Sequence, residues 1–248
     1  MKGSPMRLHG IGAVLVFTAF FGGIFAFFGW FIYASYKRRK ALEFWCRLRG
    51  FDLGRPGLLI RWGSGNFVLA SKKIGDIDEG IADKYPAFEV FDSGIPPRYA
   101  FNIWRGKARD RDILGFDYRY WTTGSDADRG QCAFTAVIVS GSRSLTPLHV
   151  SPQVWREEEN EPHGAEAVSL REAGFDKEYY VECRDAGWAR QVLSPEVRKH
   201  MQALPCAEVW TAAGDVLVKS LHPVSNMQDL DQMLAVAHGI LDGAAPHG

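Results

Sequence analysis

An uncharged run of 26 residues, Ile11 to Tyr36, constrains this chain more than any other feature of its sequence. A hydrocarbon layer about 30 Å thick needs roughly 20 helical residues, so the run is long enough to cross a bilayer as one helix. A cleaved signal peptide would have a shorter apolar region, basic residues before it and a small-residue cleavage site after it. Here the basic cluster Lys37 to Lys40 comes after the run. The sequence therefore predicts an uncleaved transmembrane helix over 11–36.

The residues at the two ends of this run predict its orientation. Lys2 and Arg7 precede it, whereas four consecutive basic residues follow it. The positive-inside rule places the more basic side in the cytoplasm. We therefore expect a single-pass protein of the cell membrane, with its soluble domain cytoplasmic and the short tail 1–10 on the other side. The predicted membrane-interface residues are Trp30, Tyr33, Tyr36, Lys37, Arg38, Arg39 and Lys40.

Small residues recur at every fourth position of the predicted span. Thr18, Gly22 and Ala26 fall on one helix face, and such small-xxx-small faces let two membrane helices approach closely. Glycine and alanine are also frequent in spanning helices generally. The pattern predicts a weak homodimer through this face, and the alternative is the ordinary composition of a spanning helix.

A basic juxtamembrane helix is predicted over 37–50, as a continuation of the span. Its apolar side consists of Leu42, Phe44, Trp45 and Leu48, and Gly50 suits a C-terminal cap. That side either lies on the membrane or packs on the domain that follows. The basic cluster lies near anionic lipid headgroups in both cases, and its simplest role is that of a topology signal.

The rest of the chain, 51–248, has the composition of an acidic globular domain. Residues 1–50 hold eight of the 29 basic residues and one of the 29 acidic residues, so residues 51–248 carry seven more acidic than basic side chains. A negative net charge argues against a general nucleic-acid binder, which needs a basic field facing phosphates. The hydrophobic fraction of 46% excludes a disordered chain. Four cysteines without a close pair exclude a CxxC zinc site and a disulfide-dense scaffold.

The patterning of 51–248 predicts an α+β domain with a mainly antiparallel sheet and late helices. Strands are expected over 99–105, 113–121, 131–140, 147–151, 175–183, 207–211 and 216–221, and helices over 185–193, 194–204 and 228–241. Residues 51–98 are less regular, with short strands at 58–62 and 66–71 and one helix at 76–85. The acidic stretch 155–167 is expected to be a solvated loop. Strands joined by hairpins, without βαβ alternation, make a doubly wound nucleotide fold unfavourable.

Several short motifs, in order, resemble a known family. They are Arg38 to Glu43 leading to Arg49-Gly50-Phe51; Tyr85 to Phe88 and Phe91 to Gly94; Ile103 to Gly106 and Gly115 to Tyr120; Leu148 to Pro152; and Phe175 to Val181 followed by Asp185, Ala189 and Leu193 to Pro195. The chain is similar to bacterial membrane proteins of unknown function. These have one or two N-terminal spans, a basic juxtamembrane helix and an α+β soluble domain containing a Phe-Asp-Tyr strand. The resemblance implies the fold, the anchor and the location, and no activity, ligand or catalytic residue.

The sequence contains no recognisable catalytic or cofactor motif, so we expect no catalytic, cofactor-binding or metal-ligating residues. His149 and His163 flank the acidic loop, but the set lacks the spacing of metal ligands. Asp117, between Phe116 and Tyr118, allows two interpretations. It is either a site carboxylate between aromatic rings or, as period-two alternation favours, a solvent-facing residue of a strand whose aromatic side chains form the core.

Two hypotheses about function remain. The first is a binding or scaffolding module at the cytoplasmic membrane face, with the bilayer and an unidentified protein as partners. The second is a membrane-tethered hydrolase whose residues converge only in the fold. A site of convergent, perturbed carboxylates and histidines would favour the hydrolase.

Overall fold

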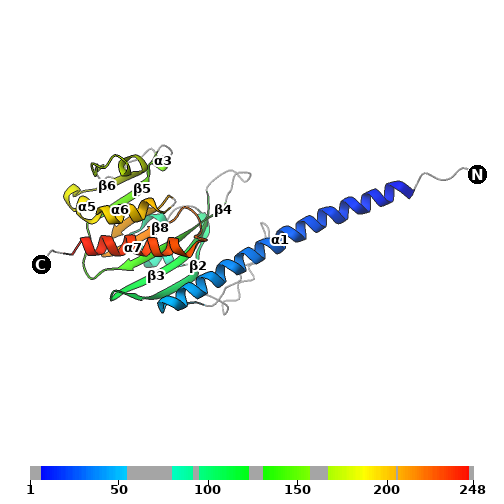
Figure 1. The fold of residues 1–248 in the computed structure, drawn as a ribbon, viewed down its shortest axis with the longest axis horizontal. Coiled ribbons are helices and arrows are strands. Elements are labelled where there is room, and N and C mark those ends of the chain that lie inside the picture. Colours follow the sequence, from blue (N-terminus) through cyan, green and yellow to red (C-terminus); the bar gives the residue numbers. More distant parts are fainter. Residues whose placement is uncertain are drawn as a thin grey trace, which may run out of the picture. The chain divides into compact units, whose positions relative to one another are not determined.

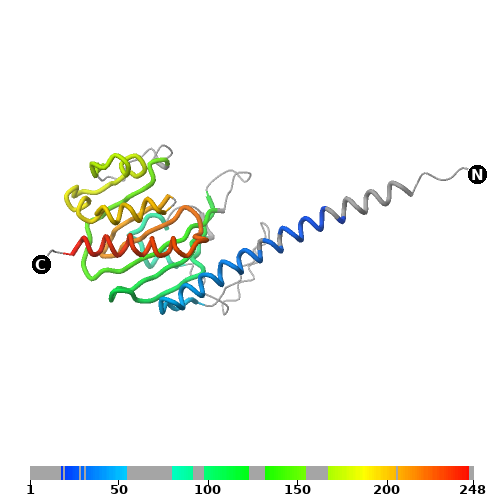
Figure 2. Tube along the Cα trace, in the orientation of Figure 1, coloured from blue at the N-terminus to red at the C-terminus, as the bar shows by residue number. Residues whose placement is uncertain are grey.

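The computed structural model describes residues 7–54, 80–91, 95–122, 131–156, 167–204 and 206–245, and the side chains of α1 are described from Thr18, apart from Ala19, Phe28 and Phe31. Figure 2 distinguishes the described parts of the trace by colour. The chain divides into two compact units, Met1–Phe44 and Trp45–Gly248. The predicted strands at 58–62 and 66–71 and most of the acidic loop 155–167 lie outside the described residues.

The first unit is built on one long helix, α1 (Arg7–Arg49), whose last residues belong to the second unit. It runs without a break through both the expected span and the basic segment. Among the residues that the structure describes, no helix is long and apolar enough to cross a membrane. The expected span 11–36 falls partly outside the described side chains, which begin at Thr18.

The second unit contains an eight-stranded sheet with the strand order β1-β2-β3-β4-β8-β7-β5-β6 (Figure 1). Every pair of neighbouring strands is antiparallel. The strands are β1 (Asp52–Leu53), β2 (Ile95–Ala108), β3 (Arg111–Trp121), β4 (Gln131–Ser140), β5 (Leu148–Pro152), β6 (Tyr179–Cys183), β7 (Glu208–Ala212) and β8 (Asp215–Lys219). The expected α+β fold with an antiparallel sheet is therefore confirmed.

The helices of this unit come mainly late in the chain, as expected. They are α2 (Ile81–Lys84), η1 (Glu89–Phe91), α3 (Gln153–Arg156), α4 (Phe175–Glu178), α5 (Ala186–Val192), α6 (Pro195–Gln202) and α7 (Met227–Gly243). The predicted caps are present: the Asp185 side chain accepts a hydrogen bond from the Trp188 backbone, and Ser194 accepts one from Val197. Helix α7 packs on β4 and β8 and beside α5 and α6, so these three helices cover one face of the sheet (Figure 1).

One predicted strand begins later than expected. Residues 175–178 form the helical turn α4, and β6 begins at Tyr179. The Phe175 ring stacks on Tyr179 at 4.7 Å, and the Asp176 carboxylate accepts bonds from Leu170 N and Ser169 Oγ. These contacts satisfy the polar groups of the turn, so the local aromatic pattern that suggests an extended chain is overridden.

The two faces of the sheet have separate cores because side chains alternate along each strand. On the face opposite the α5–α7 layer, Phe116, Tyr118 and Phe134 are buried under the segment that contains Phe88 and Phe91. The burial of Phe116 and Tyr118 confirms that these two aromatic residues of β3 belong to the core, and the half-buried Tyr120 packs against it. We name this side of the sheet the aromatic face and the other the helix face.

The last turn of α1 shows where one apolar residue of the predicted juxtamembrane helix packs. Trp45 is buried against Phe51 and Trp104, with ring centroids 5.5 and 5.0 Å away. Its indole Nε1 donates to Asp231 at 3.1 Å, and Asp231 also pairs with Arg49. Trp45 therefore packs on the domain, whereas Leu48 remains 66% exposed.

Candidate functional site

A cluster of charged side chains crosses four neighbouring strands on the aromatic face. It consists of His149 on β5, Glu182 on β6, Glu208 on β7 and Lys219 on β8. The register pairs His149 with Glu182 and Glu208 with Lys219, and Trp210 opposite His149 lies two residues from Glu208. Directly opposed residues point to the same face, so the sheet register alone assembles this ion cluster.

The ion cluster is connected by short contacts. His149 Nε2 lies 2.9 Å from Glu208 Oε1, and Nδ1 lies 3.3 Å from Glu182 Oε2. Lys219 Nζ donates to the other oxygen of Glu208 at 2.7 Å. The side chains of His149, Glu182, Glu208 and Lys219 are 15%, 4%, 8% and 14% exposed. Charges buried to this degree are maintained only when they are paired, and two cations against two carboxylates balance.

Aromatic rings complete the surroundings of the two cations. The His149 ring stacks on Trp210 with centroids 4.8 Å apart and planes inclined by 11°. Lys219 Nζ lies 5.0 Å from the Phe134 centroid and 5.6 Å from the Trp210 centroid. Both contacts place a cation against a π face, which favours the charged forms.

The carboxylates determine the protonation state of His149. Burial of the ring is the largest single influence and opposes protonation, but hydrogen bonds and charge from Glu208 and then Glu182 together outweigh it. The pKa of His149 is consequently raised above its ordinary 6.5. A carboxylate can only accept, so the imidazolium donates from both nitrogens. Nearby, burial and the thiol of Cys132 raise the pKa of Tyr120 to about 12, which keeps that phenol protonated at neutral pH.

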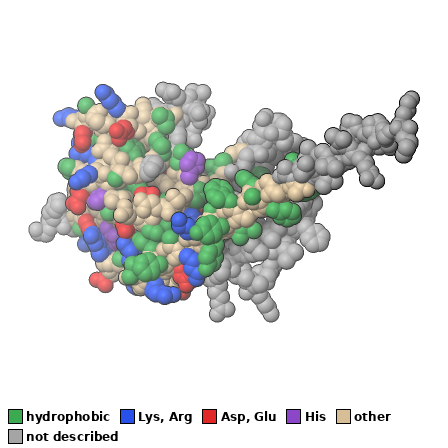
Figure 3. Space-filling view, turned by 45° about the vertical axis from the view of Figure 1, so that its right-hand side comes forward, with side chains coloured by type: hydrophobic (Ala, Val, Ile, Leu, Met, Phe, Trp, Pro, Cys, Tyr) green, Lys and Arg blue, Asp and Glu red, His purple; other side chains and the backbone are tan. Residues whose placement is uncertain are grey.

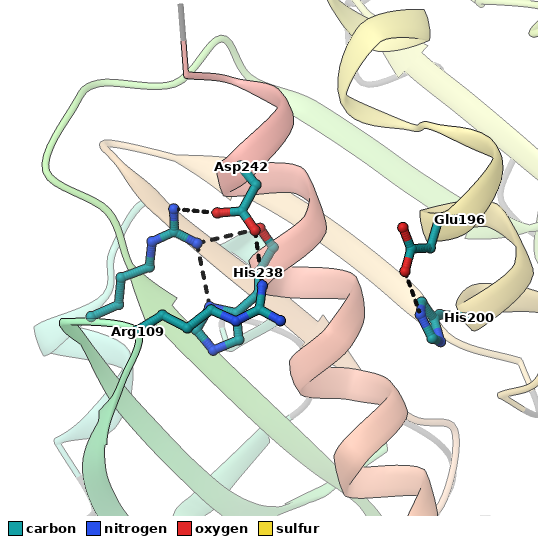
Figure 4. Close-up of polar contacts among 6 residues, drawn as sticks. Arg109, Glu196, His200, His238 and Asp242 are labelled. Atoms are coloured by element: carbon teal, nitrogen blue, oxygen red, sulfur yellow. Dashed lines mark hydrogen bonds and ion pairs between the residues drawn. The ribbon is translucent and has the colours of Figure 1, made fainter.

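A second polar cluster lies on the helix face, where the β2–β3 hairpin meets α7 (Figure 4). Arg109 and Asp110 form the two-residue turn, with positive φ angles of 51° and 60°, as a hairpin turn of the I′ kind requires. Arg109 Nη1 and Arg111 Nη2 donate to the two Asp242 oxygens at 2.9 and 2.7 Å. Arg111 Nη1 also lies 3.3 Å from both the Nδ1 and the backbone oxygen of His238. We call this set the hairpin clamp.

His238 in the hairpin clamp is electrostatically opposite to His149. Arginine only donates, so Nδ1 must accept and the proton of the neutral ring lies on Nε2. That Nε2 is buried and has no hydrogen-bond partner among the described residues. Burial, followed by the charges of Arg109 and Arg111, lowers the pKa of His238 below 6.5. The clamp fastens the hairpin to α7 and contains no obvious reactive group.

A pocket of about 390 Å³ opens at the same end of the sheet. Its lining residues are Tyr85, Arg105, Gly106, Lys107, Asp112, Ile113, Leu114 and Ser140. Lys107 Nζ lies 3.3 Å from Asp112 Oδ1, and both side chains are 71% exposed, so this pair is weak. Burial and the charge of Asp215 raise the pKa of Tyr85 against the opposing effect of Arg105. The pocket contains neither a histidine nor a cysteine.

The structure places Asp117 differently from the favoured expectation. Its side chain is 1% exposed, so the prediction that it faces solvent is wrong. Asn102 Nδ2 and Thr135 Oγ1 each donate to one of its oxygens at 2.7 Å. Asn102 has a φ of 52° at a register shift between β2 and β3, which turns its amide toward the carboxylate. Both oxygens of Asp117 thus accept hydrogen bonds within the sheet, as expected for a carboxylate with a structural role.

The predicted membrane and dimer residues lie along α1. Trp30, Tyr33 and Tyr36 are 60–65% exposed, and Lys40 Nζ lies 5.9 Å from the Tyr36 centroid and 3.0 Å from Glu43. Thr18, Gly22 and Ala26 are exposed. Their roles at a membrane or in a dimer remain predictions. Over the described residues, no group of three or more His, Cys, Asp or Glu side chains is arranged to hold a metal ion.

Three members of the ion cluster could not be predicted from the sequence. Glu182, Glu208 and Lys219 each occur in or at the end of a short apolar strand, where one polar residue is ordinarily solvent-facing. The one sequence signal that could have pointed to these residues is a charged side chain in or next to an otherwise apolar strand. Bringing His149 to Glu208 requires the pairing of β5 with β7, which are 59 residues apart at this contact.

Comparison with protein families and with characterised proteins gives no match. Among solved structures, the mycobacterial trehalose monomycolate transport factor A, TtfA, is similar with 16% identity. The similarity covers 83% of this chain and 93% of that chain, with a TM-score of 0.47. This degree of likeness is too low to establish a shared function.

Proposed function

We propose that this chain is a membrane-anchored binding or scaffolding module whose domain lies at the cytoplasmic face, and that it is not a hydrolase. The observation that carries this choice is the geometry of His149: its two ring nitrogens are directed at two carboxylates, 2.9 and 3.3 Å away. A catalytic histidine of the hydrolase type turns one nitrogen to a carboxylate and the other to a nucleophile. His149 is therefore suited to holding charge within the sheet and not to proton transfer.

The other described clusters support the same choice. The Nδ1 of His238 faces Arg111, and the Nδ1 of His200 faces Gln232. The Nε2 of His200 lies 3.9 Å from Glu196 (Figure 4). Basic and acidic side chains are interspersed on the domain surface that Figure 3 shows, which suits a protein surface better than a nucleic-acid site. A binding module needs no catalytic constellation, and these contacts are those of a framework.

The membrane part of the proposal rests on the sequence of α1. The uncharged run 11–36 has the length of a span, and Lys37 to Lys40 follow it on the side that the positive-inside rule assigns to the cytoplasm. The lipid bilayer is then the first partner. Thr18, Gly22 and Ala26 would allow a weak homodimer within it.

Membrane attachment is tested by alkaline extraction of membranes from cells that express the full chain. The wild type should stay with the membranes. The double variant Phe20→Arg and Phe25→Arg should be released, because each arginine at the centre of a span costs about 2.5–3.5 kcal/mol. Val154→Arg is the matched control, since Val154 is 65% exposed on the domain, and it should stay bound. Release of the wild type would contradict the anchor.

Topology and chemistry are tested separately. A reporter that is active only in the cytoplasm, fused after Gly248, should be active, and one that is active only outside should be silent. The hydrolase alternative predicts turnover of ester, phosphoester or peptide probes by the purified full chain, and loss of that turnover in His149→Gln but not in Glu196→Gln would place it at the ion cluster. Such a result would overturn the binding-module assignment while leaving the anchor intact.

A further inference from the structure

Glu182 is the most buried member of the ion cluster and depends most on one partner. Its side chain is 4% exposed, and in the described part of the chain the group that contacts its carboxylate is His149 Nδ1, at 3.3 Å. Glu208, by contrast, is held by both His149 and Lys219. The charge balance of Glu182 thus depends on the protonation of one imidazole nitrogen.

Glu182 also lies on an edge strand of the sheet. β6 is the last strand in the sheet order, and β5 is the strand beside it. On its outer side it is met by an isolated bridge between Ala167 and Glu182 and by a bond from Val168 N to Val181 O of 2.8 Å. Edge strands have fewer main-chain bonds to lose than central ones, so local opening begins there at low cost.

We propose that His149 and Glu182 form a pH-sensitive latch that holds β6 and the segment 167–168 on the sheet. When the ring carries both protons, Nδ1–H donates to Glu182 and Nε2–H donates to Glu208. When the ring loses one proton, the closer Glu208 keeps Nε2–H. Nδ1 then presents a lone pair to a buried carboxylate, and the contact changes from attraction to repulsion. The latch opens at β6 while β7 and β8 stay joined through Glu208 and Lys219.

The charged and titratable groups around His149 determine whether the latch weakens or strengthens as the pH rises. His149 is faced by Glu182 from β6, Glu208 from β7 and Lys219 from β8, with Trp210 stacked on its ring. Tyr120 on β3 and Cys132 on β4 lie on the same face, and that phenol stays protonated. Because the pKa of His149 is higher in the folded sheet than its ordinary 6.5, closure is most favourable below pH 6.5. It weakens as the pH rises from 6.5 to the folded value.

The latch is tested by hydrogen–deuterium exchange of the full chain in detergent micelles over about pH 5.5 to 9, corrected for intrinsic exchange. Protection of 167–168 and 179–183 should fall by up to about tenfold for each pH unit above 6.5 and then level off, since one proton is released. Protection of 208–212 and 215–219 should stay constant over the same range. Equal losses in all four segments, or none in β6, would overturn the proposal.

Two matched variants sharpen the test. Glu182→Gln supplies an amide that can donate to neutral Nδ1, so β6 protection should become independent of pH. Glu196→Gln, at a glutamate that is 85% exposed beside His200, should retain the wild-type dependence. If Glu182→Gln does not fold, the His149 ring signals in the wild-type NMR spectrum decide: titration at or below 6.5 contradicts the latch. A pH-dependent β6 in folded Glu182→Gln contradicts it as well.

Discussion

In the described part of the chain, each face of the sheet holds a histidine that is largely removed from water, and the two histidines have neighbours of opposite charge. His149 lies between Glu182 and Glu208 with a raised pKa, whereas His238 lies beside Arg109 and Arg111 with a lowered pKa. Both rings are largely removed from water, and burial disfavours the charged form in both. The two pKa shifts differ in direction because the carboxylates outweigh burial at His149, whereas the arginines add to the effect of burial at His238.

The largest expected effect comes from removing the ring on the aromatic face. His149→Leu leaves two buried carboxylates opposite the single cation Lys219, so we expect the free energy of unfolding to fall by about 3–5 kcal/mol. Urea unfolding of the full chain in detergent, followed by tryptophan fluorescence, measures this. A loss below about 1 kcal/mol, typical of an exposed ion pair, would show that the ion cluster is solvated.

The wild-type pH profile should have a maximum, because the two histidines act on opposite sides of it. His149 contributes stability that is complete below its ordinary 6.5 and is lost as pH rises to its raised folded value. His238 contributes stability that is complete above 6.5 and is lost as pH falls to its lowered folded value. Each limb should change by up to about 1.4 kcal/mol per pH unit. Melting temperatures that fall on one side of pH 6.5 alone would disprove the paired account.

The same leucine substitution on the helix face should have the opposite sign. His238→Leu removes a buried Nε2–H that has no partner among the described residues, while Arg111 keeps the backbone oxygen of residue 238 and Asp242. An unsatisfied buried donor costs about 1–3 kcal/mol, so we expect a gain of about 1 kcal/mol at neutral pH and a flattened acid limb. A marked loss of stability in urea unfolding would show that this nitrogen has a partner.

The smallest expected effect is at the exposed part of the hairpin clamp. Asp242→Ala removes the carboxylate that both arginines share, but Asp242 is 49% exposed and Arg109 is 65% exposed. We expect at most about 1 kcal/mol, and less at high salt, because solvent screens such pairs. Arg109→Ala is the gentler control, with about 0–0.5 kcal/mol expected. An effect as large as that of His149→Leu would remove the contrast between the two faces.

Local patterns in the sequence predict the elements but not the site. Alternation over 113–121 and 131–140 correctly indicates the paired strands β3 and β4, and Asp185 and Ser194 correctly mark helix starts. Alternation correctly places Asp117 on the face opposite Phe116 and Tyr118, but that face is covered as well, so the carboxylate is buried and bonded to Asn102 and Thr135. The β7–β8 hairpin follows from the local pattern, but the ion cluster also requires β5 to pair with the distant strands β6 and β7, and that pairing has no local signature. Glu182 and Glu208 therefore look like ordinary solvent-facing residues in the sequence.

Two carboxylates raise the pKa of His149 against the effect of burial, whereas burial and two arginines lower the pKa of His238. The most direct test is an NMR titration of the histidine ring signals in the full chain, assigned with His149→Gln and His238→Gln. We expect the pKa of His149 to lie above 6.5 and the pKa of His238 to lie below it, so that the two titration curves fall on opposite sides of the ordinary histidine value. Two curves on the same side of 6.5, or in the reverse order, would contradict this expectation.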